Sequence, residues 1–364
     1  MSKNTNVIEN IEKEIVKIDK KENTLFFFVV DTKGVASGSL EYIYNLAMAA
    51  KKGGYNVTML HEETEFVGVG SWLGEDFAAL PHANVTKDNV NVSPSDLVFI
   101  PEIFAKVMNQ IKKLPCKRIA ILQNYDYLIE QMPFSAEWRS FGINECITND
   151  AYNENLIKSI FPTTHVTIIP PCISSVFGET NEPKNMVVNI VAADQADVNR
   201  IVKPFYWKYP TLRWVSFRDL RGMTKDNFAK SLREAPITIW MDEYTSFGYS
   251  AIEAMKSGAI VMAKIMRNEV SWAQEDGTLR NCCVWFDDVN TIHKQIASVV
   301  RSVITDKVPD ILAKEQKKVV DLFDNDKSEK LFVDYIDGAL DNRKKEMVVL
   351  ESQAKKTEDK KEEK

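Results

Sequence analysis

The chain has 364 residues, of which 45% are hydrophobic and 27% are charged, and its formal net charge is −6. This is ordinary globular composition with enough apolar residues for two cores, because single cores stop growing near roughly 250–300 residues. The negative net charge argues against a protein that holds nucleic acid by charge neutralisation alone.

The first half of the chain alternates predicted strands and helices. It starts with an arm of mixed charge over residues 1–23, which we interpret as a loose segment or a short amphipathic helix. Residues 24–30 form a continuous apolar run, typical of a strand buried on both faces of a parallel sheet. Further predicted strands are 55–60, 96–100, 118–122, 145–148 and 166–169. The predicted helices between them start near 39, 103 and 151, and a short helix is predicted near Tyr127. Such alternation is typical of a doubly wound sheet, so we predict a Rossmann-like domain over 24–172.

The second half repeats this pattern after a linker. Residues 173–185 contain prolines and show no periodicity, which indicates a connection between domains. Predicted strands then follow at 186–191, 212–217, 236–240, 259–263 and 282–286, with helices near 198–208, 225–234, 247–256, 289–304 and 310–323. We therefore predict a second Rossmann-like domain over 186–327. The carboxyl ends of the two sheets should enclose a cleft, where open α/β sheets bind their ligands.

The chain ends in a predicted helix over 328–342 and a charged tail over 343–364. The tail has almost no apolar residues after Leu350, so we expect it to be disordered or a frayed helix. Five scattered cysteines without a CxxC pair indicate a reduced chain, which we expect to be cytoplasmic. The polar start and the lack of a long apolar run predict no signal peptide and no membrane span.

The strongest local pattern follows the strand predicted at 236–240. Residues 243–258 read EYTSFGYSAIEAMKSG and open a helix. Gly248 would let a phosphate approach the backbone, and the N-terminus of the helix favours an anion. Glu253, one to two turns into the helix, could accept hydrogen bonds from ribose hydroxyls. A helix start with a solvent-facing glutamate and no ligand explains the same residues equally well.

This stretch resembles the signature of family 4-type retaining glycosyltransferases of the GT-B fold, which reads FGxxxxEAMxxG. The matching residues are Phe247, Gly248, Glu253, Ala254, Met255 and Gly258. Residues 34–60 also look like the N-terminal glycine loop and second strand of that family, and residues 147–177 look like its passage into the linker. The pieces keep the order and spacing of the family, and the resemblance covers roughly residues 25–340.

The resemblance implies an α/β chain of two Rossmann-like domains facing across a cleft, the second binding a nucleotide-sugar and the first an acceptor. It implies transfer of the sugar to an acceptor hydroxyl with retention of configuration and without a metal ion or cofactor. The donor-binding residues it implies are Ser37, Gly38, Thr245, Ser246, Phe247, Gly248, Tyr249, Ser250 and Glu253. The helix over 328–342 corresponds to a last helix that crosses back to the first domain.

The sequence departs from this family where cations grip the diphosphate. Members usually carry an arginine and a lysine after the first strand of the second domain, but no basic residue is in register near Ala193. Thr245 stands where an acidic residue is usual. We expect Arg218 to supply the missing charge, which makes Arg218 and Glu253 the candidate catalytic residues. Without cations, several kcal/mol of transition-state stabilisation would be lost.

These departures leave two alternatives open. One is a catalytically inactive GT-B scaffold that binds a glycan, a nucleotide-sugar or a partner transferase. The other is a different GT-B enzyme, such as a sugar epimerase or an inverting transferase.

A polar run in the first domain, Gln123 to Tyr127, follows a predicted buried strand and looks like the corresponding run of rhamnan-type transferases. Gln123, Asn124 and Asp126 are therefore candidate ligands of the acceptor or the sugar, although a polar loop without function explains the run as well. The acceptor class is open between a glycan, a lipid-linked glycan, a protein and a modified nucleic-acid base.

Overall fold

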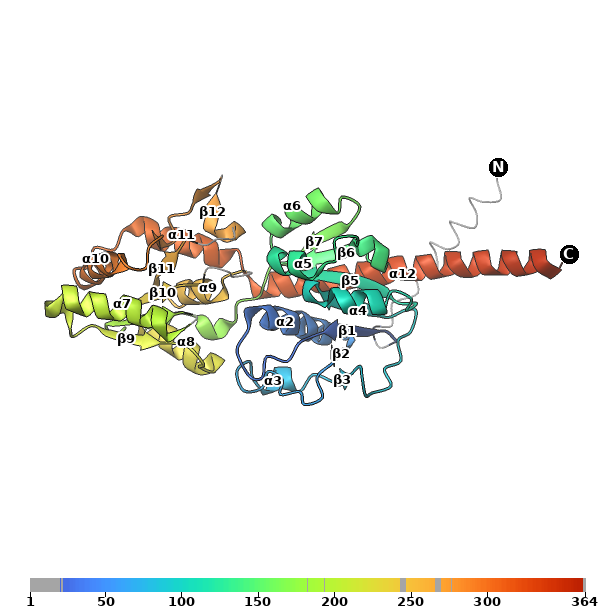
Figure 1. The fold of residues 1–364 in the computed structure, drawn as a ribbon, viewed down its shortest axis with the longest axis horizontal. Helices are drawn as coiled ribbons and strands as arrows, with labels where there is room; N and C mark the ends of the chain where they lie inside the picture. Colours follow the sequence, from blue (N-terminus) through green and yellow to red (C-terminus); the bar gives the residue numbers. More distant parts are fainter. Residues whose placement is uncertain are drawn as a thin grey trace.

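The computed structural model of the protein describes residues 20, 22–181, 183–192, 194–242, 247–265, 270–275 and 277–362. Most of the arm expected over residues 1–23 lies outside this part of the chain. No helix in the described part is both long enough and apolar enough to cross a membrane. The described residues form two α/β domains, and the last helix runs along the first domain and projects beyond it (Figure 1).

Seven parallel strands form the first sheet. In chain order they are β1 (Thr24–Phe28), β2 (Asn56–His61), β3 (His82–Asn84), β4 (Leu97–Pro101), β5 (Lys117–Leu122), β6 (Glu145–Thr148) and β7 (His165–Ile168). Across the sheet the order is β3-β2-β1-β4-β5-β6-β7. In β1, Leu25 and Phe27 pack into one core while Phe26 and Phe28 pack into another. Both faces of β1 are therefore buried, which explains its continuous apolar run.

The helix after β1 is α2 (Gly38–Lys52). The hydroxyl of Ser37 caps it by accepting the backbone N–H of Leu40 at 3.4 Å, and Gly53 forms its C-cap. The other helices of the first domain are α3 (Glu75–Ala78), α4 (Ala105–Gln110), α5 (Tyr125–Gln131) and α6 (Ala151–Ile160). The order of the sheet changes direction between β1 and β4, so the start of α2 lies where such sheets bind ligands.

Five parallel strands form the second sheet. They are β8 (Val187–Val191), β9 (Ser216–Asp219), β10 (Ile237–Trp240), β11 (Ile260–Lys264) and β14 (Val284–Phe286), in the order β14-β11-β10-β8-β9. The helices are α7 (Gln195–Lys208), α8 (Lys225–Glu234), α9 (Tyr249–Lys256), α10 (Ile292–Ile304) and α11 (Asp310–Asp321). A short hairpin, β12 (Gln274–Glu275) and β13 (Thr278–Leu279), lies outside the sheet.

Two kinds of feature differ from the sequence predictions: one strand is misplaced, and several short elements were not predicted. The strand predicted over 212–217 is β9, Ser216–Asp219, because Pro210 begins a 3-10 turn that ends at Leu212. This difference moves the carboxyl end of β9 two residues along the chain. The short elements β3, α3 and the hairpin were not predicted, since two to four residues are too few to show a period.

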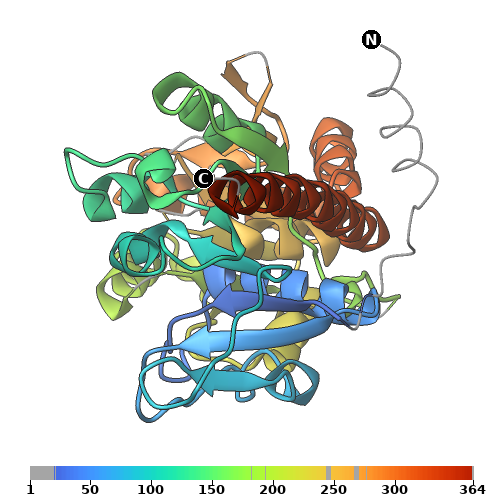
Figure 2. The ribbon, with the colours of Figure 1, turned by 90° about the vertical axis from the view of Figure 1, so that its right-hand side faces the viewer.

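The last helix, α12 (Asn325–Glu362), docks on the first domain although it follows the second. It lies beside α2 in both views (Figures 1 and 2). Glu329 pairs with Lys52 of α2 at 2.6 Å, and the ring of Phe332 packs against those of Phe27 and Phe99 in the first sheet. Nε of Arg343 donates to the carbonyl oxygen of Pro94 at 2.9 Å. The last helix therefore crosses back to the first domain.

The charged tail over 343–364 continues this helix to Glu362, which agrees with the helical one of the two expected alternatives. Its residues are mainly lysine, glutamate, glutamine and alanine, which favour helix, and it contains no glycine or proline. Lys345 pairs with Asp341 at 3.6 Å one turn earlier, which adds a little support. The first part of α12 is anchored by packing, and the rest extends it.

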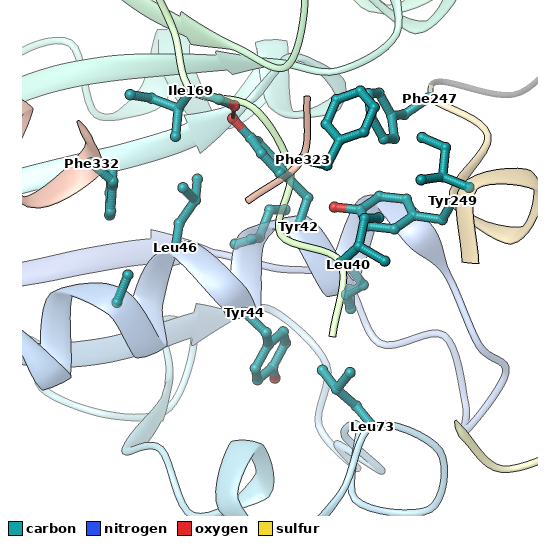
Figure 3. Close-up of a cluster of buried hydrophobic side chains, with 14 of the residues drawn as sticks. Leu40, Tyr42, Tyr44, Leu46, Leu73, Ile169, Phe247, Tyr249, Phe323 and Phe332 are labelled. Atoms are coloured by element: carbon teal, nitrogen blue, oxygen red, sulfur yellow. Dashed lines mark hydrogen bonds between the residues drawn. The ribbon is translucent and has the colours of Figure 1, made fainter. Parts of the chain in front are cut away.

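A shared apolar core joins the two domains. Figure 3 shows Leu40 and Tyr42 of α2 next to Phe247 and Tyr249, which come from the start of α9 in the second domain. Phe323, just before α12, meets Phe247 edge to face with ring centroids 5.0 Å apart. The domains thus contact each other through buried side chains, and polar residues gather beside this contact.

Candidate functional site

A cavity of about 640 Å³ lies between the two domains at the carboxyl ends of both sheets. Its first-domain wall consists of the β1–α2 loop over 34–38, with Glu41 and Trp72. Its second-domain wall consists of the end of β8, the β9–α8 loop over 220–225 and the first turns of α9. We call this space the interdomain cavity. The topology of the two sheets, more than any one motif, brings these segments together.

Two helix N-termini, one from each domain, face the interdomain cavity. α2 begins at Gly38 and α9 at Tyr249, and both residues line the cavity together with Ser37 and Ser250. The two helix starts are in close contact, because a Cβ atom on Gly38 would lie 3.0 Å from Cδ2 of Tyr249. The first backbone N–H groups of a helix have no carbonyl partner within that helix, and together with the positive ends of two helix dipoles they favour an anion at this point.

Glu253 is buried at the wall of the same cavity and is 5% exposed. This excludes the alternative of a solvent-facing glutamate. Burial is the main reason that the pKa of Glu253 rises to about 8; the charge of Glu41 adds to the rise, and Lys225 and Lys256 oppose it. A raised pKa favours the neutral form of the carboxyl group, which can both donate and accept a hydrogen bond.

Phe247 and Gly248 build the core beneath the start of α9. Phe247 is 1% exposed, and its carbonyl oxygen accepts a hydrogen bond from Nε1 of Trp272 at 2.7 Å. Gly248 has a φ of +80°, and a Cβ atom there would lie 2.7 Å from Cη2 of Trp240. The ring of Phe247 therefore packs in the core, and a donor contact at this residue stays a prediction. The lack of a side chain at Gly248 is required by Trp240 whether or not a phosphate binds.

Two basic side chains that the sequence analysis did not select line the cavity. The ammonium group of Lys225 forms an ion pair with Glu41 of the opposite domain. The guanidinium group of Arg221 pairs with Asp219, and its Nη2 donates to Oε1 of Gln195 at 2.7 Å. Both residues follow the carboxyl end of β9. They would have been candidates if the sequence had placed that strand end correctly.

The structure does not bring Arg218 to the interdomain cavity. Arg218 lies inside β9 beside Asn189 of β8, and its Nη1 is 3.0 Å from Oε2 of Glu234. Glu234 ends α8 and precedes β10, so this pair lies toward the opposite edge of the sheet from the cavity. Arg218 is thus placed away from the predicted diphosphate site. The predicted donor residues Thr245 and Ser246 lie outside the described residues.

The predicted acceptor residues belong to a polar network at the ends of β4 and β5. Gln123 and Asn124 are 3% and 4% exposed, and their backbone N–H groups donate to Oε1 of Glu102 at 3.1 and 2.7 Å. The side chain of Asn124 caps α5 by accepting the N–H of Asp126 at 2.9 Å. None of the three predicted residues lines the interdomain cavity. The structure gives Asn124 a capping role, and acceptor binding at this run stays a prediction.

Glu102 is the buried carboxyl group that organises this network. Burial raises its pKa to about 7, against the opposing effect of the two N–H groups that it accepts. Its second oxygen, Oε2, has no hydrogen-bond partner among the described residues. No sequence pattern indicated Glu102, because a glutamate after a buried strand is usually exposed.

No group of three or more histidine, cysteine, aspartate or glutamate side chains in the described part of the chain is arranged to hold a metal ion. The groups that could face an anion in the cavity are the backbone N–H groups of the two helix starts and the side chains of Arg221 and Lys225.

We compared the sequence of the chain with those of known proteins. No protein-family model matches the chain. A curated relative, the alpha-1,6-glucosyltransferase of Actinobacillus pleuropneumoniae serotype 7 (strain AP76), is 24% identical over 203 residues, which are 53% of this chain and 61% of that protein. The match therefore spans less than two thirds of the length of the relative.

Two solved structures share the architecture along most of the chain. The pneumococcal O-GlcNAc transferase GtfA, solved in complex with UDP and GlcNAc, has a TM-score of 0.59 at 9% identity and covers 88% of this chain and 99% of its own. Sucrose-phosphate synthase from Thermosynechococcus elongatus has a TM-score of 0.59 at 13% identity and covers 88% of this chain and 100% of its own. These likenesses show that the chain has the GT-B fold, which confirms the predicted fold class; at such identities they show nothing of its activity.

Proposed function

We propose that this protein is a glycosyltransferase that moves a sugar from a nucleotide-sugar donor to an acceptor hydroxyl. One observation carries the proposal: the interdomain cavity places two helix N-termini next to the buried carboxyl group of Glu253. A nucleotide-sugar joins a diphosphate to a ribose, and the cavity offers an anion site beside a hydrogen-bonding group. The GT-B fold and the name of the curated relative support the same proposal.

The proposed reaction breaks the bond between the anomeric carbon and the donor phosphate oxygen. Both electrons of that bond leave with the nucleoside diphosphate. The acceptor oxygen bonds to the anomeric carbon on the same face, so configuration is retained, and the acceptor proton passes to the departing phosphate. These steps balance without a metal ion or cofactor, and negative charge on the leaving group is met by the groups at the cavity. Hexosyl transfer is part of this proposal.

The nucleotide is placed by the groups that the two domains contribute. The backbone N–H groups at Gly38 and Tyr249 face the diphosphate, and the carboxyl group of Glu253 meets the ribose hydroxyls. The acceptor approaches from the side of the first domain. Acceptors consistent with this arrangement are a glycan, a lipid-linked glycan, a protein or a modified nucleic-acid base.

A second candidate function is a GT-B scaffold that binds a nucleotide-sugar without turnover. One specific observation favours it. At the end of β8, where related enzymes usually carry cations, the cavity is lined by Val191 and Ala192. A cavity that binds the nucleotide but lacks those charges would stabilise the donor more than its transition state.

The test measures nucleoside diphosphate released from a panel of nucleotide-sugars, starting with UDP-glucose, in the presence of simple glycoside acceptors. Glu253→Met keeps the approximate length of the side chain but removes the oxygens that are proposed to meet the ribose hydroxyls. Glu234→Met is the matched control, because Glu234 pairs with Arg218 away from the cavity. We expect release from one donor, at least about tenfold slower in Glu253→Met and unchanged in Glu234→Met.

Two other outcomes decide between the candidates. Binding of a nucleotide-sugar without release, with every acceptor tried, would favour the scaffold. Release that is equally fast in both variants would contradict the proposed role of Glu253, and neither binding nor release would contradict both candidate functions.

A further inference from the structure

A basic side chain, that of Lys225, lines the interdomain cavity at a position where its own helix does not stabilise a positive charge. Lys225 is the first residue of α8. The positive end of a helix dipole disfavours a cation at that place, so the ammonium group needs an anionic partner. In this structure the partner is Glu41, from the opposite domain, and the two side chains are 15% and 10% exposed.

We propose that Lys225 binds the diphosphate of the donor, and that it does so by exchanging its partner Glu41 for the phosphate. The inference rests on the proposed function, since it concerns the same cavity. It assigns the counter-charge to the β9–α8 loop instead of the end of β8.

The choice of Lys225 follows from the charges that face the cavity. Among the described residues lining it, the basic ones are Arg221 and Lys225. Nε of Arg221 donates to both carboxylate oxygens of Asp219, at 3.0 and 2.9 Å, so its charge is neutralised within its own domain. Lys225 is paired across the domain boundary, and a flexible stem with three rotatable donors suits a change of partner.

Glu41 keeps a second stabilising interaction when Lys225 leaves it. It lies in the first turn of α2, where the positive end of that helix stabilises a carboxylate. The backbone of Lys225 stays in place meanwhile, because its N–H donates to the carbonyl oxygen of Trp72 in the first domain at 3.0 Å. Only the side chain of Lys225 has to move.

The exchange makes opposite predictions for the two partners. Lys225→Met removes the counter-charge, so affinity for a nucleoside diphosphate should fall at least about tenfold. Glu41→Gln frees the ammonium group, so affinity should rise by about three- to tenfold. In the double variant the gain from Glu41→Gln should vanish, because the gain acts through Lys225.

The experiment is isothermal titration of the full-length protein with UDP, GDP, ADP and dTDP, followed by titration of each variant with the nucleotide that binds and with its monophosphate. Lys230→Met is the control, because Lys230 lies on the same helix with an exposed side chain. Lys225→Arg keeps the charge and should keep most of the affinity, which separates charge from folding. The monophosphate should be affected less by Lys225→Met than the diphosphate.

The outcomes separate this inference from the proposed function. If the wild-type protein binds a nucleoside diphosphate and Lys225→Met binds it equally well, the inference is wrong while the proposed function stands. The same holds if Glu41→Gln weakens binding or if its gain survives in the double variant. If the wild-type protein binds none of the nucleotides, the result contradicts both the inference about Lys225 and the proposed function.

Discussion

Replacing Glu102 by glutamine is expected to make the protein more resistant to unfolding at alkaline pH. The backbone N–H groups of Gln123 and Asn124 bind Oε1 of this residue, and the amide oxygen of glutamine can keep both bonds. The substitution removes only the ability to ionise. Because the pKa of Glu102 is raised to about 7 by burial, the folded protein keeps a proton that the unfolded chain loses near pH 4.5.

The size of the effect follows from the two pKa values. Between pH 4.5 and pH 7 the folded state binds more protons than the unfolded state, so the contribution of Glu102 to stability is complete at low pH and is lost as pH rises through this window. A pKa of about 7 against 4.5 gives a loss of about 2–3 kcal/mol between pH 5 and pH 8.5. The glutamine variant should not show this loss.

The assay is urea unfolding followed by far-ultraviolet circular dichroism at pH 5 and pH 8.5. The free energy of unfolding of the variant, relative to the wild-type protein, should rise by about 2–3 kcal/mol between the two pH values. Glu130→Gln, an exposed residue of α5, should leave the difference near zero. Parallel pH curves for wild type and Glu102→Gln would refute the reasoning, because Glu102 would then ionise without cost in the folded protein.

Two further perturbations test other parts of the structure. Gly248→Ala should destabilise the protein by about 2–4 kcal/mol, because it adds backbone strain at positive φ to a clash with Trp240, and thermal unfolding measures this loss. Deleting residues 345–364 should change the melting temperature by less than about 2 °C, because only the projecting end of α12 is removed. Deleting 325–364 should prevent stable folding, since it uncovers the core around Phe332.

Matched changes isolate these causes. Gly277→Ala introduces the same strain, at a φ of +76°, with no atom within 4 Å of the new Cβ, so it should cost less than Gly248→Ala. Equal losses at the two glycines would show that the clash with Trp240 is relieved. A large fall in melting temperature from the shorter deletion would show that the projecting end of α12 packs on the domain.

Local patterns predicted most of the fold. The apolar run at 24–30 and the glycines at 53 and 54 were sufficient to place β1, α2 and β2, because each element is defined by a few neighbouring residues. β9 was misplaced since its predicted start, Leu212, is an apolar residue of a 3-10 turn. The identity of an apolar residue does not show whether its side chain is buried in a turn or in a strand.

The candidate site was predictable only where its residues lie close together in the sequence. The start of α9 and Glu253 lie within a few residues of each other, so one motif indicated both. The pair of Glu41 and Lys225 joins residues 184 positions apart in opposite domains, and nothing in either neighbourhood indicates the other. Arg218 was chosen because it follows the strand that was predicted two residues too early. The direction of a side chain at a strand end depends on that register.

The crossing of α12 back to the first domain separates the order of synthesis from the order of completion. β1 to β7 leave the ribosome first, but the face of the sheet at Phe27 and Phe99 is covered by Phe332, near the end of the chain. The second domain, whose elements from β8 to α11 are contiguous, can close its core while that face is still open. The first domain is thus synthesised first but completes its core last. A gene fragment ending at the linker would encode the first sheet without the helix α12 that covers it.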